Sequence, residues 1–134
     1  MNIIDFISRN IFLKQIFPNG LTESVLLGQI GLNVGGQLSL NIHTQQKPEQ
    51  EVSKWGLWGK NYNVIVIRLL GLGGENVIIN GCKKINYGKI NVIKGDDRTF
   101  ITQTGDEWFI EIDVDHLIFQ GCDTYIDGGD DPAL

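Results

Sequence analysis

Apolar and polar residues alternate strictly along two stretches of this chain. In residues 37–43, Leu38, Leu40 and Ile42 occupy every second position among polar side chains. In residues 108–115, four apolar residues alternate with Phe109 and three acids. Successive side chains of a β-strand point to opposite faces, so a period of two is typical of a strand with one buried face. Both stretches are predicted to be half-buried strands.

Several other apolar runs lie between clusters of Gly, Asn and Asp. The run Val64-Ile65-Val66-Ile67 is apolar at every position, as in a central strand covered on both faces. Gly35-Gly36 favours a hairpin turn. Further strands are expected in residues 26–34, 77–79, 85–93, 100–104 and from residue 117 onward. About six to eight short strands with such turns predict a mainly β fold of antiparallel sheets, either a sandwich or a half-barrel.

The first segment has a helical pattern instead. Isoleucines recur near helical spacing in residues 3–17, and either Ser8 or Asn10 is placed to cap a second short helix. Pro18-Asn19-Gly20 then favours a turn. We expect this helical segment to cover one sheet face, and α+β is an alternative label for the fold.

The length of 134 residues is that of a single domain. We expect a helical cover in residues 1–17, an antiparallel β core in residues 21–126 and an acidic flexible tail in residues 127–134. The polar stretch 44–54 is expected to be a loop within this domain. No apolar run has the roughly 20 residues that span a bilayer. The N-terminal residues do not have the pattern of a signal peptide, so we expect a cytoplasmic protein with no membrane partner.

Charge is divided unevenly along the chain. Residues 1–95 hold ten Lys and Arg against five acids, whereas residues 96–134 hold only Arg98 against eleven acids. Such asymmetry is typical of a protein with a charged partner, although acids on solvated loops give the same count. Nucleic acid is not expected at the acidic end, because its phosphates would be repelled there.

No catalytic constellation stands out in the sequence. Gly71-Leu72-Gly73-Gly74 follows an apolar strand, but a short β-like run and not a helix comes next, which argues against a nucleotide site. Asp113, Asp115 and His116 offer metal-ligand chemistry, yet no further ligands converge with them in the sequence. Cys82 and Cys122 are expected to be reduced, buried thiols, with a disulfide as the alternative. We therefore expect a binding protein with no cofactor and no metal.

Three aromatic residues follow the polar loop. Trp55, Trp58 and Tyr62 either close one end of the core or act as anchors for a partner. If they are exposed, they offer a stacking platform for a carbohydrate or another small ligand.

The order of these elements resembles the immunity protein 50 family of bacterial toxin–immunity systems, over roughly residues 11–125. The features that carry the resemblance are a helix ending in Ile16-Phe17-Pro18, a hairpin over residues 25–42, a Pro-bearing polar loop followed by a Trp, the strand Tyr62-Asn63-Val64-Ile65-Val66-Ile67-Arg68-Leu69, the step Ile79-Asn80-Gly81, Ile90-Asn91-Val92, Trp108-Phe109-Ile110-Glu111-Ile112 and Ile118-Phe119. Many members have Gly-Trp after the apolar step, where this chain has Gly81-Cys82.

The resemblance implies a non-enzymatic cytoplasmic protein that binds and neutralises a cognate toxin, by occluding its active site or holding it inactive. It supplies no catalytic residues. An acidic face would steer such a protein toward a basic cleft of the toxin. The candidate acids for this face are Asp96, Asp97, Asp106, Glu107, Glu111, Asp113 and Asp115. Alternatives are a carbohydrate- or small-ligand-binding β-sandwich, a metal-dependent enzyme and a structural subunit that pairs through strand edges.

Overall fold

The two alternating stretches form strands in the computed structural model, which describes residues 2–128. They are β3 (Leu38–Thr44) and β8 (Trp108–Val114), and each turns its alternating apolar side chains into the interior. The continuous apolar run begins β4 (Val64–Leu72), whose first four residues are buried. The prediction of a mainly β fold with a short helical segment is confirmed.

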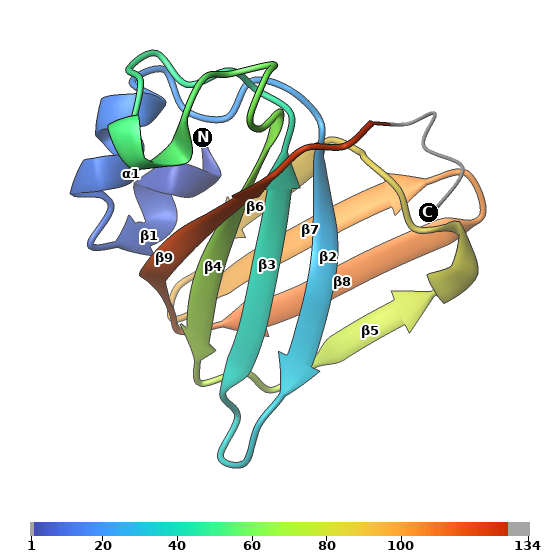
Figure 1. Ribbon diagram of the computed structural model, residues 1–134. Helices are drawn as coiled ribbons and strands as arrows, with labels where there is room; N and C mark the ends of the chain where they lie inside the picture. Colours follow the sequence, from blue (N-terminus) through green and yellow to red (C-terminus); the bar gives the residue numbers. More distant parts are fainter. Residues whose placement is uncertain (1, 129–134) are drawn as a thin grey trace.

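Two sheets make up the body of the protein (Figure 1). The first has five strands in the order β1-β9-β4-β3-β2, and the second has four in the order β5-β8-β7-β6. The parallel pair is β1 with β9, and the remaining neighbours are antiparallel. The bounds of the other strands are β1 (Ile7–Ser8), β2 (Val25–Leu32), β5 (Val77–Asn80), β6 (Ile90–Lys94), β7 (Thr99–Gly105) and β9 (His116–Tyr125).

The core lies between the two sheets, whose strands cross at a steep angle in Figure 1. Each sheet contributes the residues of one face, because alternation along a strand sends every second side chain inward. The largest fully buried side chains include Leu40, Ile42, Ile65 and Ile67 from the first sheet and Ile101, Ile110 and Ile112 from the second. Leu13, Ile16 and Phe17 add a third contribution from the N-terminal segment.

The N-terminal segment is less helical than its isoleucine spacing predicts. It contains the 3-10 helix η1 (Ile3–Phe6) and the helix α1 (Ile11–Ile16), with β1 between them. Ile7 extends because it pairs with Leu117 at the edge of β9, and this pairing outweighs local helical preference. Asn10 precedes α1 as expected, but its side chain donates to the carbonyl of Ile4 and does not cap the helix.

One strand begins later than the sequence-based expectation. The strand expected from residue 85 begins at Ile90, after the short 3-10 helix η3 (Cys82–Lys84) and an irregular stretch. Within that stretch Gly88 exchanges backbone hydrogen bonds of 2.9 Å with Val25, which joins the two sheets at one corner. The buried side chain of Gln103 donates to both of their carbonyls.

The expected tail begins with an ordered contact. The amide of Asp127 donates to the Asn63 side chain at 2.7 Å, and the Asn63 side chain donates back to the Asp127 carbonyl at 3.0 Å. The rest of the predicted acidic tail, residues 129–134, lies outside the described residues.

Candidate functional site

The candidate acids are distributed over the second sheet. Glu111 and Asp113 lie on the outer face of β8, because the buried Ile110 and Ile112 occupy the inward positions. Glu111 is half-buried and stands opposite Ile78 of β5. The alternation of the sequence therefore predicted the correct face for these two carboxylates.

The other four candidate acids outside the Arg98 contacts lie in turns at opposite ends of this face. Asp96 and Asp97 occupy the turn between β6 and β7, beside the end of β8, and both are exposed. Asp106 and Glu107 occupy the turn between β7 and β8 at the other end. The seven residues of β7 separate the two turns by roughly 20 Å. The acids thus surround the sheet face and do not form one patch.

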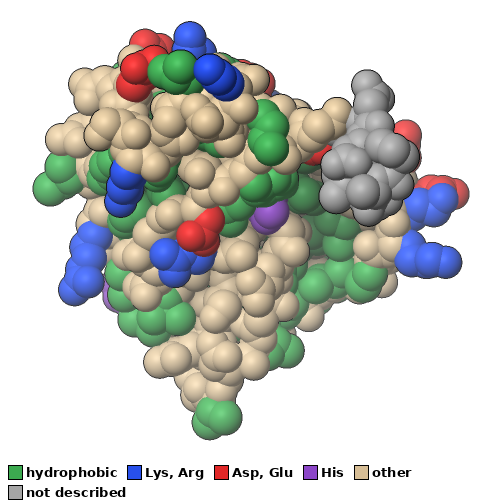
Figure 2. Space-filling model, viewed as in Figure 1, with side chains coloured by type: hydrophobic (Ala, Val, Ile, Leu, Met, Phe, Trp, Pro, Cys, Tyr) green, Lys and Arg blue, Asp and Glu red, His purple; other side chains and the backbone are tan. Residues whose placement is uncertain are grey.

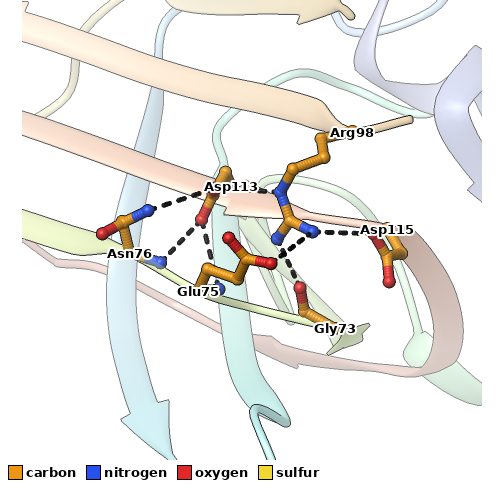
Figure 3. Close-up of polar contacts among 6 residues, drawn as sticks. All are labelled: Gly73, Glu75, Asn76, Arg98, Asp113 and Asp115. Atoms are coloured by element: carbon orange, nitrogen blue, oxygen red, sulfur yellow. Dashed lines mark hydrogen bonds and ion pairs between the residues drawn. The ribbon is translucent and has the colours of Figure 1, made fainter. Parts of the chain in front are cut away.

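Arg98 neutralises two of the candidates (Figure 3). Its Nε donates to Asp113 Oδ2 at 2.9 Å, and its Nη1 donates to Asp115 Oδ1 at 2.8 Å. The second terminal nitrogen donates to the carbonyl of Gly73, and Glu75 approaches within 3.6 Å. These contacts tie the loop after β4 to the open end of the second sheet.

Asp113 is an internal acceptor. Its Oδ1 accepts from the amide of Asn76 at 2.7 Å and from that of Glu75 at 3.3 Å. Burial raises the pKa of the carboxyl, but the hydrogen bonds from Asn76, Arg98 and Glu75 outweigh it and hold the pKa below its usual value. Asp113 is only 4 % exposed, so the candidate surface does not include its side chain.

Gly73 allows this cluster to close. Its φ is +68°, and a Cβ there would lie 2.0 Å from Asp115 Oδ2. A side chain would therefore collide with the carboxylate that Arg98 binds. The Gly71-Leu72-Gly73-Gly74 segment serves this packing, and the short strand β5 follows it in place of a helix.

Sequence reasoning missed the cluster. Arg98 was seen only as a lone base among acids, and Glu75 and Asn76 lie 38 and 37 positions from Asp113. The available signal was the single arginine itself, since an isolated base within an acidic stretch has several carboxylates to choose from. Its actual partners depend on strand register, which alternation alone does not give.

The three aromatic candidates form a packed group. The ring of Tyr62 meets Trp55 at 5.7 Å and Trp58 at 5.2 Å between centroids, both edge to face. Phe12 of α1 meets Trp55 at 5.7 Å in the same way. Tyr62 is 1 % exposed, so it closes the core and offers no surface, whereas the two tryptophans are half-buried.

Trp55 also lines a shallow pocket of about 220 Å³. Phe12 and Phe119 form its apolar walls, and Lys54, Gly121 and Cys122 complete the lining. Burial raises the pKa of the Cys122 thiol to about 12, which keeps it protonated and unreactive at neutral pH. Cys82 lies elsewhere, on η3, and is exposed, so the expectation of two buried thiols is wrong for Cys82.

The suggested metal ligands are otherwise engaged or scattered. Asp113 and Asp115 bind Arg98, while His116 is exposed at the start of β9. Among residues 2–128 no group of three or more His, Cys, Asp or Glu side chains is arranged to hold a metal ion.

The outer face of the first sheet is sparsely charged. In Figure 2, which looks onto this face, few charged side chains interrupt the surface over β2 and β3. Arg68 and Asp123 form an exposed ion pair there, with a nitrogen–oxygen distance of 2.9 Å. The exposed acids Asp96, Asp97, Asp106 and Glu107 lie instead in the turns at the two ends of the second sheet.

Within the described part of the chain, none of the helices has the length and apolarity needed to cross a bilayer. No family model, curated protein or solved structure matches this chain.

Proposed function

We propose that this protein is a non-enzymatic immunity protein of the immunity protein 50 type, which binds and neutralises a cognate bacterial toxin in the cytoplasm. The observation that carries the proposal is the gathering of acids around one sheet, with four exposed acids in its turns and the half-buried Glu111 on its outer face. After Arg98 is satisfied by Asp113 and Asp115, five candidate acids remain: Asp96, Asp97, Asp106, Glu107 and Glu111.

These acids suit a basic partner. Of the five, Glu107 contacts Lys84 at 3.6 Å, and both of those side chains are largely exposed, so the pair leaves most of the negative potential in place. Toxins that act on nucleic acid need a basic cleft, and an acidic surface raises the rate of encounter with it. Occupation of that cleft would exclude the toxin's substrate without chemistry by this chain.

The test first asks whether the neighbouring reading frame encodes a toxin domain, and then uses that domain. Co-expression should restore growth, and the purified proteins should bind with an association rate that falls as salt rises. Replacing Asp96, Asp97 and Glu111 by Asn, Asn and Gln should slow association about tenfold or more at low salt. Asp113 and Asp115 stay unchanged, because they hold Arg98 in the fold.

A matched control neutralises three exposed acids from the first half of the chain, Glu23, Glu49 and Glu51. This variant removes the same charge from other surfaces and should associate nearly as fast as the wild type. Equal slowing by both triple variants would reject the acidic face. Failure of co-expression to restore growth would reject the immunity function.

A second candidate function rests on the pocket beside Trp55. Its three aromatic lining residues, Phe12, Trp55 and Phe119, are suited to stacking against a sugar or another flat small molecule. A thermal-shift screen against sugars tests this function, since saturable stabilisation would favour it over the first. Trp55→Ala should then abolish the stabilisation, and Leu57→Ala, a change at an exposed neighbour, should not.

A further inference from the structure

The outer face of the second sheet carries large apolar side chains as well as acids. Ile78 on β5 is 43 % exposed, and Ile93 on β6 is 59 % exposed. Phe100 and Phe109 are half-buried on β7 and β8. Apolar residues of this size on a solvent-facing sheet favour an interaction surface when they adjoin one another.

The strand register places Ile78 and Phe109 beside Glu111, with Phe100 and Ile93 on the next two strands of the same face. Ile78 is directly opposite Glu111 on one side, and Thr102 is directly opposite on the other. Phe109 lies two positions earlier on the same strand and therefore on the same face. Phe100 and Ile93 face each other across the β6–β7 pair. Directly opposed side chains lie about 5 Å apart at Cβ, so Glu111 has the apolar Ile78 beside it on one strand and Thr102 on the other.

Glu111 has no counter-charge within the described residues. Unlike that of Asp113, its side chain makes no hydrogen bond and no ion pair there, although the residue is half-buried. A carboxylate in this setting has lost part of its hydration without gaining a partner. A cation placed over it by a binding partner would restore that loss, and the flanking apolar groups would exclude water from the contact.

We propose that this face binds a protein segment that presents an arginine or lysine flanked by apolar side chains, with the cation on Glu111 and the apolar groups on Ile78 and Ile93. The inference rests on the proposed function and deepens it by giving the chemistry of the toxin surface. A second copy of this chain does not suit the face, because the acids at both of its ends would repel the same acids of the copy.

The probes are three capped pentapeptides: Leu-Arg-Leu-Arg-Leu, Ser-Arg-Ser-Arg-Ser and Leu-Glu-Leu-Glu-Leu. Each is titrated into the labelled protein while amide chemical shifts are followed by nuclear magnetic resonance. The first peptide should shift the amides of Ile78, Ile93, Thr102 and Glu111. Its affinity should exceed those of the other two by about tenfold or more, because only it supplies both parts of the contact.

Two variants test the ionic part and the apolar part of the contact separately. Glu111→Gln should weaken the first peptide about tenfold, and so should the double change Ile78→Thr with Ile93→Thr. Threonine keeps the β-branched shape that strands favour, so the sheet should persist. The control is the double change Leu32→Thr with Val34→Thr. These residues are 71 % and 98 % exposed, and they lie in a hairpin that has no acid, so the control removes exposed apolar surface far from Glu111.

The peptides contain no toxin, so their result is independent of the growth test. Three results would overturn the inference while leaving an immunity function intact. They are equal binding of all three peptides, chemical-shift changes centred on another face, and no chemical-shift change at millimolar peptide. Self-association through this face, seen as a doubled mass in light scattering that Ile78→Thr with Ile93→Thr abolishes, would also overturn it.

Discussion

Arg98 and Asp113 face each other across the open end of the second sheet, with Nε and Oδ2 2.9 Å apart. The arginine precedes β7, the aspartate lies within β8, and their side chains are 19 % and 6 % exposed. Asp113 also accepts from the loop that connects the two sheets. One carboxylate therefore holds together three segments that are distant in the sequence.

The stability of the fold should depend on Asp113 much more than on Asp123. Asp113→Ala leaves the amides of Glu75 and Asn76 and the Nε of Arg98 without their acceptor, which should cost about 2 kcal/mol. Asp123→Ala breaks an ion pair whose side chains are 47 % and 63 % exposed, which should cost no more than about 1 kcal/mol. Denaturant unfolding of both variants measures the difference, and equal losses would contradict it.

Acid should weaken the fold partly through Asp113. Its pKa lies below the usual 3.8 in the folded protein, so the unfolded chain takes up this proton first as the pH falls. The contribution is complete at neutral pH and is lost as the pH drops through the folded pKa. The free energy of unfolding should therefore fall less steeply in Asp113→Ala than in the wild type below about pH 4. Asp97→Asn, a change at an exposed acid, should keep the wild-type slope.

His43 should make a second pH-dependent contribution. Its Nδ1 lies 2.9 Å from the Tyr125 hydroxyl, and its ring occupies the space above Gly28. Burial lowers the pKa of His43 below 6.5, so the unfolded chain binds this proton more readily than the folded protein.

The free energy of unfolding should therefore decrease as the pH falls below about 6.5, by at most about 1.4 kcal/mol per pH unit. His43→Gln should remove that part of the slope, whereas His116→Gln, at an exposed position, should not. A proton titration of the His43 ring by nuclear magnetic resonance gives the direct measurement. A midpoint at or above 6.5 would contradict the prediction.

The two thiols should react at very different rates. Burial raises the pKa of Cys122 to about 12, whereas Cys82 is exposed. The thiolate is the reactive form, so iodoacetamide should alkylate native Cys122 at least about a hundredfold more slowly than Cys82. Peptide mass spectrometry over time measures both sites. In Cys82→Ser the fast phase should vanish, and a surviving fast phase would show that Cys122 is accessible.

The strands were predictable because their signal is local. Leu38, Leu40 and Ile42 alternate with polar residues, and so do the residues around Ile110 and Ile112, and both stretches became strands with the expected inward faces. The helical spacing of Ile4, Ile7 and Ile11 was misleading at Ile7, because a strand edge elsewhere in the chain was available to pair with it. Local pattern therefore predicted element type best where no distant partner competed.

The sequence by itself determined the fold class, the face of β8 that carries Glu111 and Asp113, and the imbalance of charge between the two parts of the chain. Only the tertiary structure decided which acids are available at the surface. Asp113 and Glu111 are two positions apart on the same face, yet register brings Arg98 and Asn76 to Asp113 and apolar neighbours to Glu111. The physical reason is that a side chain's partners come from other strands, and strand order and register are set by packing of the whole chain.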